Sequence, residues 1–313
     1  MPRKSTKVAK LVRKEHIKYE SLSPGTVKKY RTGVRRFWFW VHVTNGARPR
    51  NVRGLDYLSG EFINFLYQDE RPVGWASDFL CGLKRLYPFC RRNLESANQY
   101  QRNWLKALVR RRACPLPWSV VKGMIGLAIL ETRHDLAIAL YLGFAGMFRA
   151  SELCRLKLAH INVIGPTSAI ISLRESKTAV RMANAEAVII KDSCLVSLLR
   201  CRIRHGNPQD ALVGSRYSEL STIIKEYACF FGVSHPHVTP HSLRRGGATW
   251  HFKRCQNIDV VQSLGRWSQA RTAKLYIDEA LADSSESELS AEGRQQLRTV
   301  LGKFPVLIQR LLV

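Results

Sequence analysis

One short stretch, residues 241–250, combines a titratable imidazole, two cations and a pair of glycines. It reads HSLRRGGATW, so His241 precedes Arg244 by three residues, and Gly246 and Gly247 follow. Arginine binds anionic oxygens through its planar fork, and glycine lets a backbone come close to a neighbour. The stretch therefore predicts an anion site. The site either binds the anion or supports a reaction at it, and the histidine makes a reaction possible because it exchanges protons near neutral pH. Residues outside this stretch are needed to distinguish the two alternatives.

Three further stretches contain residues suited to the same chemistry. In GMFRASELCRLK, Arg149 begins a predicted helix and Glu152 follows one turn later. In SLRESKTAVR, Lys177 lies in a turn between two predicted strands. In LGRWSQARTAKLYID, Trp267 precedes Tyr276 by nine residues. Each residue alone is typical of a core or a helix surface, and only the joint pattern indicates a reaction.

The four stretches, in this order, resemble the tyrosine recombinase family, the phage-integrase-like enzymes. The strongest parts are His-x-x-Arg followed by RGGAT, and a Gly-x-Trp with a tyrosine nine residues after the tryptophan. The clear resemblance covers roughly residues 115–280 and extends more weakly to the N-terminal helices, which resemble the family's core-binding domain. Trp267 stands where most members have a histidine, and Cre-like members also have tryptophan there.

These residue types are sufficient for transfer at a phosphodiester. That reaction needs a nucleophile, neutralisation of a pentacovalent phosphorane, and a proton for the leaving oxygen. A phenol is mostly protonated at neutral pH, and nearby cations favour its phenolate. Tyr276 can therefore attack phosphorus, with His241 as the proton acceptor. Arg149 and Arg244 can each bind the non-bridging oxygens, where negative charge grows.

The resemblance implies the remaining roles. Lys177 is the implied acid for the departing 5′-oxygen, Trp267 can donate its indole N–H to a phosphate oxygen, and Glu152 orients a cation or caps a helix. A covalent 3′-phosphotyrosine stores the energy of the broken strand, so no metal, ATP or other cofactor is expected. The sequence also has no GxxxxGK[ST] loop and no clustered acidic set for two magnesium ions.

Other candidate groups keep a structural interpretation. His235, His237 and His251 have no evident ligand partner for a metal site. Arg245, next to Arg244, is either a surface phosphate contact or an ion-pair partner. The two glycines are expected to allow close approach of a helix or backbone.

The composition agrees with a nucleic-acid partner. The 313 residues have a formal net charge of +26, and such a positive field favours binding a polyanion. The eight cysteines are scattered without a C-x-x-C pair, and no apolar run is long enough to span a bilayer. We therefore expect no membrane partner and an intracellular location, in the cytoplasm or nucleoid of a prokaryotic or phage host, or in the nucleus of a eukaryotic one.

The sequence predicts a mainly α-helical protein with a small antiparallel β-sheet, an α+β fold. A helical core-binding, DNA-binding domain spans residues 21–110, a linker spans 111–117, and a catalytic domain with a C-terminal helix spans 118–313. Residues 1–20 form a basic tail that is a nuclear address, a DNA-contacting arm or a solubilising segment.

The first predicted helix has an apolar face for a core and a basic face. Ser23 is its expected N-cap, and Pro24 takes the first helical position. The basic face either contacts phosphate or is simply solvated, and the excess of one sign favours phosphate. The predicted DNA contacts are Lys28, Lys29, Arg31, Arg35 and Arg36 on this helix, and Arg110, Arg111 and Arg112 at the linker.

The catalytic domain is expected to contain helices over 119–144 and 149–157, then three short strands within 161–165, 168–176 and 185–192. Helices resume at residue 193. The last helix, residues 294–313, packs either on its own chain or on a neighbouring protomer.

The expected function is site-specific DNA recombination or integration, with a homo-tetramer on paired double-stranded sites, and accessory DNA-bending proteins as an open question. A type IB topoisomerase-like strand transferase is one alternative, and the preceding helical domain favours a recombinase over it. A domesticated, non-cleaving DNA-binding protein is the other alternative. The presence of all six predicted catalytic residues argues against it.

Overall fold

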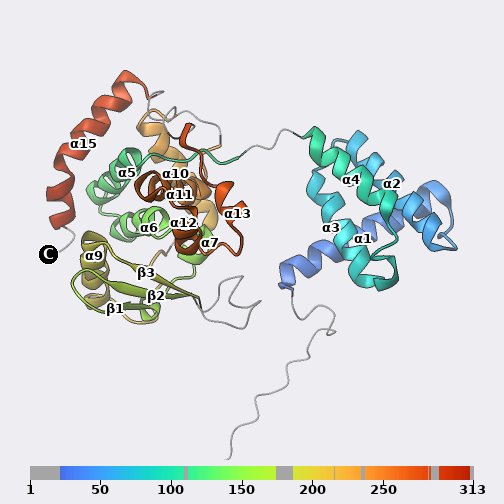
Figure 1. The fold of residues 1–313 in the computed structure, drawn as a ribbon, viewed down its shortest axis with the longest axis horizontal. Helices are drawn as coiled ribbons and strands as arrows, with labels where there is room; N and C mark the ends of the chain where they lie inside the picture. The colour runs from blue at the N-terminus through green and yellow to red at the C-terminus, as the bar shows by residue number, and fades with distance from the viewer. Residues whose placement is uncertain are drawn as a thin grey trace, which may run out of the picture. The chain divides into compact units, whose positions relative to one another are not determined.

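The computed structural model describes residues 22–108, 112–173, 186–214, 216–233, 237–280, 282 and 289–310. The chain divides into two compact units, Met1–Arg110 and Arg111–Val313. Figure 1 shows helices throughout and one small sheet in the second unit. The predicted α+β fold class, mainly helical with a small antiparallel sheet, is confirmed.

Four α-helices build the described part of the N-terminal unit, residues 22–108. Ser23 caps the first of them, because its Oγ accepts the Thr26 N–H at 3.3 Å, and the left-handed Gly46 ends it. Asp56 accepts the N–H groups of Ser96 and Ala97, both at 3.0 Å, and so fixes the start of the fourth helix. The helices are α1 (Pro24–Asn45), α2 (Val52–Gln68), α3 (Val73–Leu86) and α4 (Glu95–Ala107), with a short 3-10 turn η2 (Pro88–Cys90) before α4.

Glycines bring α1 and α3 together. A Cβ on Gly33 would lie 2.9 Å from the Phe79 backbone, and one on Gly82 would lie 2.7 Å from the Tyr30 carbonyl oxygen. Phe37 is fully buried against the Phe79 ring, with the ring centroids 4.7 Å apart. The apolar face predicted for the first helix is thus the centre of this unit's core, and its exposed basic face lies on the other side.

The C-terminal unit begins with two buried helices, α5 (Trp118–Leu130) and α6 (His134–Ala145). Both helices are mostly apolar, and the chain breaks within the polar residues 131–135, where Thr132 takes a positive φ of 58°. The following elements are α7 (Ala150–Leu153), η3 (Leu158–His160), α9 (Ser193–Arg204), α10 (Tyr217–Phe230), α11 (Pro240–Cys255), α12 (Ile258–Gly265), α13 (Ala270–Lys274) and α15 (Ala291–Arg310).

Within the described residues, three strands form one antiparallel sheet in the order β1-β2-β3. They are β1 (Ile161–Val163), β2 (Ala169–Leu173) and β3 (Glu186–Ile190). Ile161 pairs with Ile171, and Ala169 pairs with Ile190. The burial of β2 alternates along the strand, so one face of the sheet joins the core. Each strand lies within its predicted segment.

The paired glycines of α11 serve helix packing. A Cβ on Gly246 would lie 2.0 Å from the Leu116 carbonyl oxygen, and one on Gly247 would lie 2.1 Å from the Phe144 carbonyl oxygen. The close approach expected from the sequence is therefore to α6 and to the segment before α5. That segment, Cys114–Pro117, is buried, and the Leu116 N–H donates to the Ser242 carbonyl oxygen at 3.2 Å.

The last helix, α15, packs on α5 of its own chain (Figure 1). A Cβ on Gly123 would lie 2.5 Å from Leu297, and one on Gly126 would lie 2.4 Å from Val300. Leu297 and Val300 belong to the main core of this unit. Of the two alternatives left open by the sequence, the structure shows packing within the chain.

Candidate active site

The elements around α11 bring together five of the six predicted catalytic residues. His241 and Arg244 lie in the first turns of α11, where Thr239 precedes the helix and Pro240 takes its first position. Arg149 is the N-cap of α7, and Trp267 follows α12. Tyr276 comes just after α13. The sixth residue, Lys177, lies outside the described residues.

Arg244 is fully buried. Its Nη1 donates to the Met147 carbonyl oxygen, and its Nη2 donates to the Gly265 carbonyl oxygen at 2.5 Å. Its Nε has no hydrogen-bond partner. Since a guanidinium has five N–H donors, Arg244 keeps donors for an anion, and the two carbonyls fix where its plane lies.

Two aromatic rings cover Arg244. Its Cζ lies 4.6 Å from the Trp267 ring centroid and 5.6 Å from that of Tyr276. The Trp267 and Tyr276 ring centroids are 4.7 Å apart. Trp267 is itself buried, in a small cluster with Met147 and Val261. The Trp267 and Tyr276 rings therefore lie together over the Arg244 guanidinium.

His241 lies on the other side of the Tyr276 ring. Their ring centroids are 6.4 Å apart. Desolvation lowers the pKa of His241 below its ordinary value, although one side of the residue is exposed, and the cations of Arg244 and Arg149 lower the pKa further. A lowered pKa keeps the imidazole neutral at physiological pH, which is the form that accepts a proton.

Arg149 forms an ion pair with Glu152. The Arg149 Nη1 donates to Glu152 Oε1, and the Arg149 backbone N–H donates to Glu152 Oε2 at 2.8 Å. The Glu152 side chain is 4% exposed, whereas that of Arg149 is 28% exposed. Glu152 therefore has both of the roles that the sequence left open: it orients the Arg149 cation and caps α7.

A third arginine, Arg266, completes this cluster, and the sequence reasoning missed it. Its Nη2 lies 2.7 Å from Glu152 Oε2, and its side chain is 8% exposed. It stands between Gly265 and Trp267, inside the stretch already singled out. Its position in that stretch was the available signal, but a sequence does not tell whether an arginine is buried.

The arginines raise the positive potential of the site. Burial first, and then the neighbouring cations Arg149 and Arg266, lower the pKa of Arg244 to about 10. Arg244 remains protonated at neutral pH. The pKa of Arg266 is also lowered, first by burial, against the opposing effect of Glu152. Three cations and one carboxylate make this a site for an anion.

A pocket of about 430 Å³ opens beside these residues. It is lined by His241, Arg245 and Tyr276, and also by Arg112, Tyr217 and His237. Arg245 is buried and forms an ion pair with Asp278, its Nη2 lying 3.2 Å from Asp278 Oδ2. Of the two alternatives for Arg245, the ion-pair partner is the one observed. His251 donates to the Ala145 carbonyl oxygen at 2.9 Å, which is a structural role.

The predicted DNA-contact residues divide into three groups. The cations of α1 are exposed, and Arg36 also lies over the Trp75 ring, with Cζ 3.4 Å from its centroid. Arg112 is exposed at the pocket just described. Arg110 and Arg111 lie outside the described residues, as does His235. Among the described residues, no group of three His, Cys, Asp or Glu side chains could hold a metal ion.

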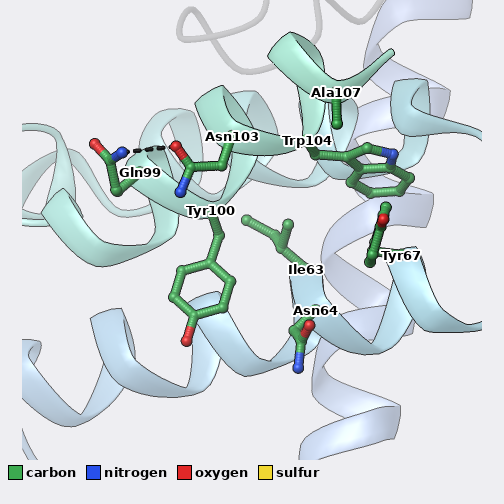
Figure 2. Close-up of a pocket in the computed structure, with 8 residues that line it drawn as sticks. All are labelled: Ile63, Asn64, Tyr67, Gln99, Tyr100, Asn103, Trp104 and Ala107. Carbon is green, nitrogen blue, oxygen red and sulfur yellow. Dashed lines mark hydrogen bonds between the residues drawn. The ribbon is translucent and has the colours of Figure 1, made fainter.

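A second pocket, of about 330 Å³, belongs to the N-terminal unit (Figure 2). It lies between α2 and α4 and is lined by Ile63, Tyr67, Tyr100 and Trp104 with amide side chains. Its lining has no charged group. It lacks the cations that would stabilise a reacting phosphate, so we assign it no part in the reaction.

Comparisons with known proteins agree with this geometry. Residues 127–282 match the phage integrase family. No curated protein matches the chain. No helix among the described residues is both long and apolar enough to cross a membrane.

Several solved structures share the fold. A XerH site-specific recombinase bound to its difH substrate has 13% identity over 80% of this chain and 76% of its own, with a TM-score of 0.56. A lambda integrase dimer bound to a COC′ core site has 15% identity over 83% and 90%, with a TM-score of 0.55. The Tn1549 transposon integrase in complex with circular intermediate DNA has 14% identity over 84% and 98%, with a TM-score of 0.51.

The family match contains the whole buried cluster around Arg244, from Arg149 to Tyr276. The fold, the cluster and the match agree, and the chain is a member of the phage integrase family, the tyrosine-type site-specific recombinases.

Proposed function

We propose that this chain cleaves and rejoins DNA strands at specific sites through a covalent bond between Tyr276 and a 3′-phosphate. One observation supports this most directly: the Tyr276 ring lies within 5.6 Å of the Arg244 guanidinium of the same chain. The proposed nucleophile and a proposed phosphate ligand therefore lie in the same site of one chain.

In the forward step, the Tyr276 oxygen attacks phosphorus and a P–O bond forms. The phenolic proton passes to His241, whose lowered pKa keeps it ready to accept. The bond from phosphorus to the 5′-oxygen breaks, and that oxygen takes a proton and leaves as a hydroxyl. The reverse step uses a 5′-hydroxyl as nucleophile and releases Tyr276, so no net oxidation or hydrolysis occurs.

The charge that grows on the phosphorane is matched by the buried arginines. Arg244 is held by two backbone carbonyls, and Arg149 is held by Glu152, so both are positioned before the reaction begins. Preorganised donors of this kind stabilise the transition state more than the ground state. Lys177 remains the proposed acid for the 5′-oxygen, on the resemblance alone, and Trp267 shields the site with its ring.

The partners follow from the family and from charge. A net charge of +26 favours double-stranded DNA, and the DNA-bound relatives support it as the substrate. We further propose a homo-tetramer on paired sites, in an intracellular compartment that contains DNA. Because Tyr276 packs on its own chain's Arg244 and Trp267, each protomer attacks within its own site.

The test is the variant Tyr276→Phe, which removes only a hydroxyl. The ring still packs on Trp267, so folding and DNA affinity should remain within about twofold of the wild type. The covalent protein–DNA complex should vanish even on a nicked substrate that traps it. Adduct is measured as a band that survives boiling in detergent. An adduct formed by Tyr276→Phe would show that the nucleophile is another residue.

Arg149→Ala serves as the partner variant, since it keeps the tyrosine and loses a phosphate ligand. It should bind DNA and form at least about 100-fold less adduct. A mixture of the two inactive variants should stay inactive if attack occurs in cis. Recovered cleavage would mean that Tyr276 is supplied by a neighbouring protomer.

A further inference from the structure

Arg266 is a buried cation to which the proposed reaction gives no role. Besides Glu152, its Nη1 and Nη2 donate to the carbonyl oxygens of Gly146, at 3.3 Å, and Met147, at 3.5 Å. With a side chain only 8% exposed, the group is directed into the protein. We therefore do not expect it to contact DNA, and any effect on the reaction must pass through its neighbours.

The first neighbour is Glu152, which serves two cations. Its Oε1 accepts from Arg149, and its Oε2 accepts from both the Arg149 N–H and Arg266 Nη2. A pair of Arg149 and Glu152 alone would be neutral, and a neutral pair attracts a phosphate weakly. Arg266 supplies a second cation for the same carboxylate. The three side chains together keep a net charge of +1 next to the reacting phosphate.

The second neighbour is Arg244. The Met147 carbonyl oxygen accepts from both Arg244 Nη1 and Arg266 Nη2. The residue directly before Arg266, Gly265, provides the other carbonyl that holds Arg244. Arg266 therefore lies between the two arginines proposed to bind the phosphate.

The backbone at Arg266 has a conformation that a smaller residue usually adopts. It ends α12 in the left-handed region, with φ 56° and ψ 44°, where glycine or asparagine is the usual residue. Glycine stands one residue earlier instead, and a Cβ on Gly265 would lie 1.8 Å from the Trp267 ring. The contacts of the Arg266 guanidinium with Glu152 and the two carbonyl oxygens offset the cost of this backbone conformation.

We propose that Arg266 is a positioning residue that neutralises Glu152, and so leaves the charge of Arg149 available to the scissile phosphate. This inference depends on the proposed function, because it needs a phosphate that is attacked.

Two variants test it in the full-length protein. Arg266→Met keeps the length of the side chain and removes its charge, and Arg266→Gly removes the side chain but suits the left-handed backbone. Both should bind DNA within about threefold of the wild type. Both should form the Tyr276 adduct about 30-fold more slowly, which is less than the roughly 10²–10³ expected for a direct phosphate ligand. Arg204→Met, at an exposed arginine at the end of α9, is the matched control and should cleave at the wild-type rate.

Two further readouts separate positioning from a structural role. The first is a substrate whose scissile phosphate is a neutral methylphosphonate. With less charge to neutralise, the deficit of Arg266→Met should shrink to about threefold. The second is the double variant Arg266→Met/Glu152→Gln, where the unpaired carboxylate is also removed. It should recover at least tenfold over Arg266→Met, as expected for residues that act through one another.

The outcomes are distinct. If the wild type forms no adduct that depends on Tyr276, the proposed function fails. If it does, and both variants cleave at the wild-type rate, the role of Arg266 is overturned. Equal losses on the charged and the neutral phosphate, without recovery in the double variant, would also overturn it. So would failure of both variants to fold, because Arg266 would then only support the fold.

Discussion

At the scale of single residues, the site combines groups that a sequence motif marks with groups whose role depends on burial. Arg149, His241 and Tyr276 are placed together as the motif predicts. The state of each is set by its surroundings: Arg244 lies beneath two aromatic rings, and His241 faces two cations. His241 and the two arginines therefore influence each other electrostatically, and pH is a direct probe of this coupling.

His241 should titrate below its ordinary pKa of about 6.5 in the DNA-free protein. Since the neutral form accepts the proton, adduct formation at subsaturating DNA should fall as the pH drops through a midpoint below 6.5. The midpoint can be read from the imidazole resonance by NMR and from the pH–rate profile. His241→Gln should slow cleavage by about 10²–10⁴ and lose this acid limb. A midpoint above 6.5 would contradict the effect of Arg149 and Arg244.

At the scale of elements, α11 positions the site because its glycines allow it to approach α6 and the Leu116 segment. Gly246→Ala should destabilise the protein by about 3 kcal/mol, because its Cβ would meet the Leu116 carbonyl oxygen, a backbone atom that cannot move aside. Gly302→Ala is the control. It lies in α15 with nothing within 4 Å of the added Cβ, and it should stabilise by about 0.5–1 kcal/mol. Urea unfolding measures both.

If the urea midpoint of Gly246→Ala equals that of the wild type, α11 shifts without a cost in unfolding free energy, and the glycine is not needed for packing. An equal loss of stability in Gly302→Ala would show that the loss in Gly246→Ala does not come from the contact with the Leu116 carbonyl oxygen.

Much of the fold is predictable from periodicity, and the exceptions have physical causes. The strands and the Ser23 cap follow from local patterns, and all were predicted. The break at Thr132 was not, because the polar residues 131–135 between two apolar runs are also compatible with one exposed turn of a longer helix. Arg266 also escaped prediction, and the ion pair of Arg245 was only one of two alternatives, because pairing between distant segments depends on tertiary packing.

At the scale of the whole molecule, the charge of +26 is the dominant property. DNA affinity should fall steeply with salt as counterions are released. Replacing four exposed cations of α1 by Gln should reduce the log–log salt slope by about 3–4. Those four are Lys28, Lys29, Arg31 and Arg35. Arg36 is left in place because it stacks on Trp75, so that its loss would also disturb the N-terminal unit.

The control for this measurement replaces four exposed cations of the C-terminal unit by Gln: Arg204, Arg298, Lys303 and Arg310. The net charge changes equally in the two proteins, so a general field effect would alter both slopes alike. An unchanged slope in the α1 variant would remove that helix from the DNA interface.

The cluster of three arginines around one carboxylate has a consequence for the life of the protein away from DNA. Like charges held close together oppose folding, and an anion that binds only the folded state relieves that opposition. Folding and substrate binding are thus linked: the chain is least stable when it is idle and gains stability when a phosphate fills the site. The same charges that prepare the site for a phosphate lower the stability of the DNA-free protein, and with it the resistance to heat and proteolysis. Its persistence in a cell then depends on how much of its time is spent on DNA.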